Sequence, residues 1–297
     1  MIGFREPGYL WWVAQKHDMP LVWGPIDAKD GFPMEYARNT SINVKAFLFL
    51  KNVITRLQLR FMPRVLRMAN QSDILFSASS DSQHSISHYW HKQSVLMNET
   101  GCSLLEIPMR NLRINNIGTS PIFNIIWCGK MDFRKQLDLA IRAVAESQIP
   151  NAVLHVVGDG DNAQYKQLAE QLKVQAIWYG RQPHDEVQKI MQNSDVLLFT
   201  SVAEGTPHVI TEALANGLPV ICHKTCGQGD VIDERVGITC QISTPNESVI
   251  GFASALKKLH EHPDLLKQLS EGCVSRAKEI TWEKKAREMV IMYKQYC

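Results

Sequence analysis

Two glutamates, Glu204 and Glu212, are separated by seven residues around a loop that joins an apolar run to a helical pattern. Carboxylates accept paired hydrogen bonds, so they suit the vicinal diols of a ribose or a hexose. The helix after the loop would begin at the carboxyl end of a parallel strand, where unpaired N–H groups bind phosphate. A nucleotide sugar has diols of this kind on both sides of a diphosphate group. The alternative is that both glutamates are simply solvated, which is the commoner case for an isolated glutamate.

The start and end of that helix can be placed from local signals. Thr206 is a good N-cap, Pro207 suits the first helical position and Gly217 suits the C-terminal cap. This puts Glu204 in the loop before the helix and Glu212 on its second turn. We therefore expect the two carboxylates to flank one crevice without sharing a helix face.

A second polar group, with Lys130, Arg134 and Lys135, follows the apolar run Ile122–Cys128. Cations at the end of a strand can neutralise phosphate charge. Lys135 is the stronger candidate for this role. Lys130 fits a phosphate ligand and a solvated loop lysine equally well.

These motifs lie in an alternation of apolar runs and helical patterns from Pro121 onward, which is typical of a parallel sheet with helices on both faces. The expected strands are Ile122–Cys128, Val153–Val157, Ile177–Tyr179, Val196–Thr200, Pro219–Cys222 and Gly237–Cys240. The expected helices are Lys135–Ser147, Asn162–Lys173, His184–Asn193 and Pro207–Asn216, with three more patterns beyond Ser248, the last opened by Trp282. The pattern predicts one complete doubly wound α/β domain.

The stretch Ser201–Val220 resembles the motif of two glutamates seven residues apart in family 4 retaining glycosyltransferases, including the Ala-Leu-Ala-x-Gly-x-Pro-Val that follows. Cys128–Ile141 resembles the diphosphate-binding segment of that family, with Lys130 for the usual Arg and Gln136 for the usual Gly. Weaker resemblances lie at Leu154–Gly160, Ile177–Gln182 and Gly227–Ile232, where Asp230 replaces a Glu. The resemblance implies a GT-B fold, α/β with two Rossmann-like domains.

The resemblance also implies roles for individual residues. Glu204 would contact the transferred sugar and Lys135 the diphosphate, and these two are the candidate catalytic residues. The implied donor-binding set is Gly129, Lys130, Lys135, Gly158, Arg181, Gln182, Glu204, Thr206, Pro207, His208 and Glu212, with Glu212 on the ribose and the start of the helix on the β-phosphate and sugar. No metal and no cofactor are implied. A UDP- or GDP-linked hexose would pass to a glycan or lipid-linked acceptor in surface polysaccharide assembly.

The first half of the chain has a thinner strand signal, with runs at Pro20–Trp23, Ile74–Ala78 and Ser94–Met97. Trp23-Gly24-Pro25 resembles a segment that lies well inside the first domain of some family members, so we expect an N-terminally truncated, incomplete domain. The predicted division is 1–117 for this partial domain, 118–280 for the sugar-nucleotide domain, and 281–297 for a helix packing back toward the N-terminal domain. Met109–Ser120 is the predicted connection.

From Tyr36 to Ser72 the chain has no acidic residue and seven Lys or Arg. Apolar residues recur there at helical spacing beside a basic stripe, and Pro63 should divide the helix. The apolar set is Phe47, Leu50, Ile54, Leu57, Phe61, Val65 and Met68, and the stripe is Arg56, Arg60, Arg64 and Arg67. Such a helix either lies on an anionic membrane surface or faces a protein core, and the pattern favours neither.

Composition narrows the partners and the compartment. A net charge of +2 does not suggest nucleic-acid binding, and seven cysteines without a Cys-x-x-Cys pair argue against disulfides and zinc. The sequence shows no signal peptide and no apolar run long enough to span a bilayer. We expect a cytoplasmic protein, peripheral on the inner face of the cytoplasmic membrane if the basic helix binds lipid.

Three other functions compete with that of a glycosyltransferase. Gly158-Asp-Gly160-Asp-Asn-Ala163 fits a dinucleotide fingerprint, but Arg181 and Gln182 stand where its acidic partner should be, which disfavours an NAD-linked oxidoreductase. A GT-B sugar-nucleotide epimerase or hydrolase would use the same crevice. A non-catalytic nucleotide-sugar-binding fragment also fits, and the sequence leaves both of these open.

Overall fold

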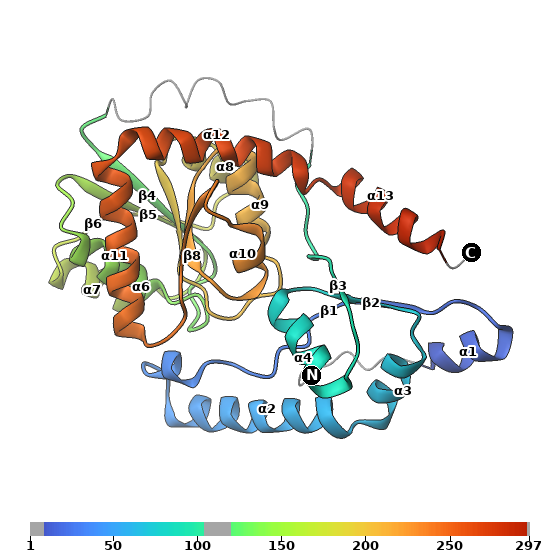
Figure 1. The fold of residues 1–297 in the computed structure, drawn as a ribbon. Helices are drawn as coiled ribbons and strands as arrows, with labels where there is room; N and C mark the ends of the chain where they lie inside the picture. The colour runs from blue at the N-terminus through green and yellow to red at the C-terminus, as the bar shows by residue number, and fades with distance from the viewer. Residues whose placement is uncertain (1–8, 104–119, 296–297) are drawn as a thin grey trace. The chain divides into compact units, whose positions relative to one another are not determined.

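The computed structural model describes residues 9–103 and 120–295. It divides into two compact units, Met1–Thr100 with Glu283–Cys297, and Gly101–Trp282 (Figure 1). The expected connection Met109–Ser120 lies outside the described residues except for Ser120. Each unit is an α/β layer structure built on a parallel sheet.

The larger unit contains a six-stranded parallel sheet, as the sequence predicts. Its strands are β4 (Phe123–Cys128), β5 (Ala152–Val157), β6 (Gln175–Gly180), β7 (Val196–Phe199), β8 (Val220–His223) and β9 (Gly237–Cys240). They are arranged in the order β6-β5-β4-β7-β8-β9. The chain therefore runs outward in one direction from β4 and in the other from β7, so the carboxyl ends of these two neighbours form the switch point where open α/β sheets bind ligands.

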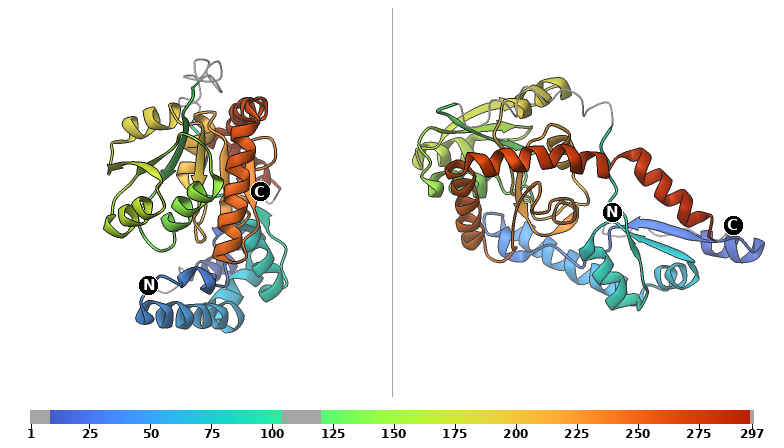
Figure 2. Two further views of the ribbon diagram at one scale, coloured as in Figure 1. Left: turned by 90° about the vertical axis from the view of Figure 1, so that its left-hand side faces the viewer. Right: turned by 45° about the horizontal axis from the view of Figure 1, so that its top comes forward.

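Helices cover both faces of this sheet (Figure 2). They are α6 (Leu137–Ser147), α7 (Ala163–Gln171), α8 (His184–Gln192), α9 (His208–Ala215), α10 (Cys226–Val231), α11 (Pro245–Glu261) and α12 (Pro263–Glu279). Alternate residues of β4 serve the two cores: Ile125 and Trp127 pack in a cluster with α6, α7 and α11, while Ile126 packs in a cluster with α8 and α9. A strand buried on both faces explains why β4 reads as an almost continuous apolar run.

The smaller unit contains a three-stranded parallel sheet in the order β1-β2-β3. Its elements are α1 (Leu10–His17), β1 (Val22–Ile26), η1 (Met34–Ala37), α2 (Ile42–Phe61), α3 (Pro63–Gln71), β2 (Ile74–Ser77), α4 (Ser80–Trp90), β3 (Val95–Leu96) and α13 (Trp282–Tyr293). Leu75 of β2 packs in a cluster with α2, α3 and α4, whereas Ile74 and Phe76 pack with residues of α13. Pro63 divides α2 from α3, as predicted.

Helix α2 packs through a face that the apolar pattern did not indicate. Its buried residues are Leu48, Asn52, Thr55 and Leu59. Asn52 anchors this face, because its side-chain amide exchanges two hydrogen bonds of 2.8 Å with the backbone of Phe32. The side chains of Phe47, Leu50, Leu57 and Phe61 are instead 51–61% exposed. The core-facing alternative is therefore wrong for these four and right for Val65 and Met68 of α3.

Among the described helices, none combines the length and apolarity needed to cross a bilayer.

Candidate functional site

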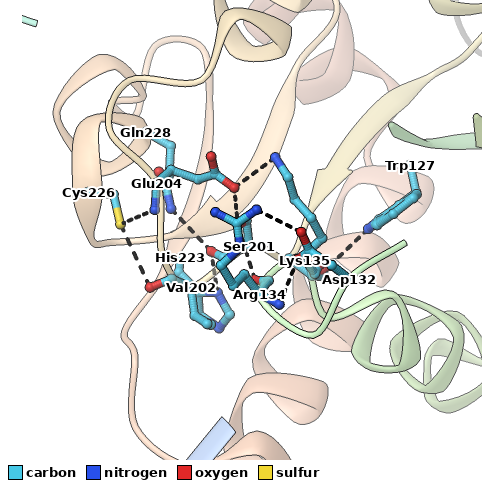
Figure 3. A network of polar contacts seen from close by, with 11 residues as sticks. Trp127, Asp132, Arg134, Lys135, Ser201, Val202, Glu204, His223, Cys226 and Gln228 are labelled. Atoms are coloured by element: carbon cyan, nitrogen blue, oxygen red, sulfur yellow. Dashed lines mark hydrogen bonds and ion pairs between the residues drawn. The ribbon is translucent and has the colours of Figure 1, made fainter. Parts of the chain in front are cut away.

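Lys135 and Glu204 meet at the switch point between β4 and β7. The Lys135 ammonium lies 2.7 Å from Oε1 of Glu204, and both side chains are only 15% exposed. Ser201 donates a second hydrogen bond of 2.6 Å to the same oxygen. Figure 3 shows both donors pointing at the Glu204 carboxylate. The two candidate catalytic residues thus form one charge-assisted, largely desolvated contact.

The loops that carry these side chains are held together by side-chain and backbone hydrogen bonds. The Thr200 hydroxyl donates a hydrogen bond of 2.8 Å to the carbonyl of Lys135. The indole N–H of Trp127 donates one of 3.1 Å to the Thr200 hydroxyl. The amide of Val202 donates 3.1 Å to the carbonyl of Arg134. Because the loop after β4 and the loop after β7 share these bonds, the position of Lys135 relative to the Glu204 loop is fixed by folding rather than by the ion pair alone.

Two residues of the segment after β4, Gln136 and Arg134, have features that bear on its predicted role in phosphate binding. Gln136, at the position where the resembling family usually has Gly, adopts φ +50°, the left-handed region that favours glycine. Arg134 contacts Asp132 at 2.7 Å, and this hydrogen bond is the main reason that the Arg134 pKa is raised, with a smaller contribution from Glu204. Arg134 is therefore a second cation within electrostatic range of the Glu204 carboxylate.

The start of α9 differs by one residue from the prediction. The helix begins at His208 with Pro207 as N-cap, and no side chain caps it, so the expected cap by Thr206 is wrong. Proline has no N–H, and of the three residues implied to bind phosphate only Thr206 and His208 have amides that can donate. Thr206 and Pro207 are buried and His208 is exposed. Gly217 follows the last turn with φ +52°, as expected of a C-terminal cap.

Glu212 lies on the second turn of α9 and is 22% exposed. Its carboxylate is 3.6 Å from Nε2 of His184, a distance too long for a hydrogen bond. The pKa of the Cys128 thiol is raised to about 12, chiefly by burial and to a smaller extent by Glu212, while Lys135 acts to lower it. Cys128, at the end of β4, is therefore within electrostatic range of both Lys135, the residue expected to contact the diphosphate, and Glu212, the residue expected to contact the ribose.

The glycines at the ends of β4 and β5 are brought together. A Cβ on Gly158 would lie 1.7 Å from the carbonyl oxygen of Gly129, and Gly158 has φ +148°. Lys130 and Arg181 are exposed, Arg181 one residue beyond β6, while Gln182 is tied to its own turn by a 2.7 Å bond to the Tyr179 carbonyl. The expected residues thus all lie after carboxyl ends of strands or on α9, with Lys135 and Glu204 in direct contact.

Several supporting residues gave no signal in the sequence. Ser201 receives two hydrogen bonds on its carbonyl, 3.2 Å from Nε2 of Gln228 and 3.4 Å from Nδ1 of His223. Burial lowers the pKa of His223 to about 4, so its ring is neutral at neutral pH. Since Nδ1 faces a carbonyl, it carries the proton, and Nε2 accepts from Ser248 at 2.9 Å. Only the Ser-x-x-Glu spacing of Ser201 and Glu204 could have been noticed beforehand.

Comparisons with known proteins indicate the family of this chain. The model of the family "Glycosyl transferases group 1" matches residues 116–275. An uncharacterised glycosyltransferase of Methanocaldococcus jannaschii is 26% identical over 175 residues, which cover 57% of this chain and 44% of that protein. The lipopolysaccharide glucosyltransferase WaaG of Escherichia coli is 33% identical over 102 residues, 33% of this chain and 27% of that one.

The fold also matches a solved structure. HepE of Anabaena, crystallised in complex with UDP, superposes with a TM-score of 0.69 at 13% identity, covering 96% of this chain and 75% of that one. At this identity the likeness concerns the fold alone. The matched residues span less than half of the length of the two relatives compared by sequence.

Proposed function

Because this chain belongs to the family "Glycosyl transferases group 1", we propose that it moves a hexose-type sugar from a UDP- or GDP-linked donor to a glycan or lipid-linked acceptor, with retention of configuration and without a metal ion. The observation that carries the proposal is the 2.7 Å contact of Lys135 with Glu204 at the switch point of the sheet. A cation and a carboxylate side by side at this edge match a diphosphate joined to a sugar.

In the proposed complex the charges are redistributed. The donor diphosphate takes the Lys135 ammonium, with Arg134 and the Thr206 and His208 amides nearby, and the sugar hydroxyls donate to Glu204. Glu212 accepts from the ribose diol. The bond between the anomeric carbon and the β-phosphate oxygen breaks as the bond to the acceptor oxygen forms on the same face, and the acceptor proton passes to the leaving phosphate oxygen. The protein contributes a preorganised charge distribution around the diphosphate.

The relatives support the class of donor and the setting. HepE was crystallised with UDP, and WaaG is named a lipopolysaccharide glucosyltransferase. A UDP-linked hexose and an acceptor in bacterial surface polysaccharide assembly are therefore the first substrates to test, with GDP conjugates as the comparison.

The test combines donor binding and transfer. We expect saturable binding of UDP, GDP or one of their sugar conjugates by titration calorimetry, weakened at least tenfold by Glu212→Ala. Glu204→Gln should keep nucleotide binding and lose most transfer. Transfer should persist in excess EDTA. An unchanged transfer rate in Glu204→Gln would refute the role of this carboxylate.

The same measurements separate the two alternatives. A GT-B epimerase or hydrolase would convert the donor without any acceptor, and free sugar or an epimeric nucleotide sugar would then appear in the absence of acceptor. A non-catalytic binding module would give the Glu212-dependent binding and no turnover. No binding of any nucleotide would contradict the whole donor-site proposal.

We also propose that α2 binds an anionic membrane surface, so that the protein is peripheral on the cytoplasmic membrane, on its inner face. The apolar face of α2 is exposed at Phe47, Leu50, Leu57 and Phe61. Helices α2 and α3 together carry six Lys or Arg and no acidic residue. Each apolar side chain can gain about 1–3 kcal/mol on burial, and each cation near an anionic surface about 1 kcal/mol. A lipid-linked acceptor would be met at such a surface.

Vesicle sedimentation tests this partner. The chain should pellet with vesicles containing phosphatidylserine or phosphatidylglycerol at low salt, and much less with neutral vesicles. The double variant Phe47→Ser and Leu50→Ser should lose binding. The matched control is Ile250→Ser, which removes a similarly exposed apolar side chain from α11. No sedimentation of the unaltered chain would refute membrane binding, and equal loss in the control would refute the role of α2.

A further inference from the structure

Cys226 opens α10 in a backbone conformation that is unusual for a residue with a side chain. Its φ is +59°, in the left-handed region that favours glycine, and its side chain is 1% exposed. A Cβ at this position carries a conformational cost that glycine would avoid. The contacts made by the thiol show what the side chain adds.

The Cys226 thiol bridges the two ends of the bend that carries Glu204. The Glu204 amide donates a hydrogen bond to Sγ at 3.4 Å. The thiol in turn donates to the carbonyl oxygen of Val202, with Sγ 3.8 Å from that oxygen. Figure 3 shows both contacts converging on the sulfur. A thiol can donate and accept at once, which a methyl group cannot.

The next two residues of α10 reinforce this contact. The Gly227 amide donates 2.9 Å to the carbonyl of Gly205, and a Cβ on Gly227 would lie 2.5 Å from Oγ1 of Thr206. Gln228, fully buried, donates to the Ser201 carbonyl at 3.2 Å. Residues 226–228 therefore contact the segment 201–206 on both sides of Glu204.

We infer that Cys226 is a positioning residue for the proposed transfer: its thiol fixes the bend 202–204 so that the Glu204 carboxylate meets Lys135 and the donor sugar. The inference rests on the proposed function of Glu204. It assigns no chemistry to the sulfur, which stays buried and makes no bond to substrate. The Glu204 backbone should therefore stay ordered only when the side chain at position 226 can both donate and accept a hydrogen bond.

The test compares Cys226→Ser, Cys226→Ala and Cys226→Gly. Two weak hydrogen bonds are lost in the alanine and glycine variants, and we expect kcat to fall about 3- to 10-fold with the donor KM changed less than about twofold. Serine keeps a donor and an acceptor and should hold kcat within about twofold. Glycine suits the positive φ, so loss of rate without loss of backbone order elsewhere would separate positioning from general destabilisation.

Amide hydrogen exchange gives a readout that does not need turnover. Exchange of the Glu204 amide should speed up in the alanine and glycine variants and stay near the original rate in serine. Cys273→Ala is the control, because Cys273, on α12, is also buried but donates to the carbonyl of Val236, outside the Glu204 loop. It should leave the exchange of Glu204 unchanged.

The outcomes for the two proposals are distinguishable. If the unaltered chain transfers sugar and the alanine and glycine variants keep kcat within twofold, the inference about Cys226 is overturned while the function stands. If the unaltered chain transfers nothing, the proposed function fails, and unchanged Glu204 exchange in the alanine variant would overturn the positioning as well.

Discussion

Removing the cation from the Lys135–Glu204 pair should destabilise the protein more than removing the carboxylate. In Lys135→Met the Glu204 carboxylate keeps its bond from Ser201 but loses its counter-ion at a site where it is only 15% exposed. A fully buried charge left without its partner costs about 3–5 kcal/mol. Because these side chains retain some access to water, we expect about 2–3 kcal/mol.

The melting temperature converts this into a measurable shift. For a unit of the size of Gly101–Trp282, 1 kcal/mol corresponds to about 2–4 °C, so Lys135→Met should melt about 4–12 °C lower. Glu204→Gln should cost less, since the amide oxygen still accepts from Ser201. In the double variant no charge is left uncompensated, so it should melt above Lys135→Met alone, a coupling that only a double-mutant cycle can measure.

An exposed pair with the same separation provides the control. Lys189 lies 2.7 Å from Glu186 on α8, but the two side chains are 64% and 48% exposed. Lys189→Met should not shift the melting temperature measurably, because exposed ion pairs are screened by solvent. The reasoning is refuted if Lys135→Met melts within 1–2 °C of the original protein, or if the double variant melts below it.

Three further predictions concern stability. His223, with its pKa lowered by burial from 6.5 to about 4, binds its proton less readily when folded; its contribution is therefore present above pH 6.5 and lost as pH falls toward 4, a change of roughly 3 kcal/mol that chemical denaturation should detect and that His223→Gln should abolish. Gly158→Ala would force a Cβ toward the Gly129 carbonyl at a positive φ, and we expect at least about 3 kcal/mol of destabilisation by thermal melting, or no folded protein. Asn52→Leu removes both hydrogen bonds to the buried backbone of Phe32, so urea denaturation should show a loss of about 2–3 kcal/mol; an unchanged midpoint would contradict this account of how α2 packs.

The sheet of the larger unit was predictable because its strands are buried on both faces. All six predicted strands are present within two residues of their expected bounds. Burial on both faces requires continuous apolar runs, and these are visible in the sequence. The contact between Lys135 and Glu204 was not predicted, although the two residues follow neighbouring parallel strands, whose carboxyl ends meet at one edge of the sheet.

The packing of α2 was not predictable from its hydrophobic pattern. The face that meets the core includes Asn52 and Thr55, two polar residues, and leaves Phe47 and Leu50 exposed. Asn52 can be buried because its amide is satisfied by the Phe32 backbone, a long-range partner that no local periodicity indicates. An amphipathic pattern shows that a helix has two faces, and tertiary hydrogen bonds decide which one is buried.

The predicted start of α9 was wrong for a more local reason. Both Thr206 and Pro207 can occupy the boundary of a helix, and propensity ranks the threonine higher as a cap. Pro207 has ψ 129°, which is extended, so the helix cannot begin before His208. The roles of Cys226 and His223 gave no signal either, because each acts on a segment more than twenty positions away in the chain.

The ion pair at the switch point also fits the proposed binding of a donor. A carboxylate and an ammonium that are mostly removed from water would each be costly to bury alone. In their mutual contact, with Ser201 as a third partner, both are compensated before any ligand arrives. In the proposed complex a nucleotide sugar would bring a matching set, an anion for Lys135 and hydroxyl donors for Glu204, so each charge would exchange one partner for another. Binding would then require little net change in charge compensation, which permits a preorganised site to remain folded and empty.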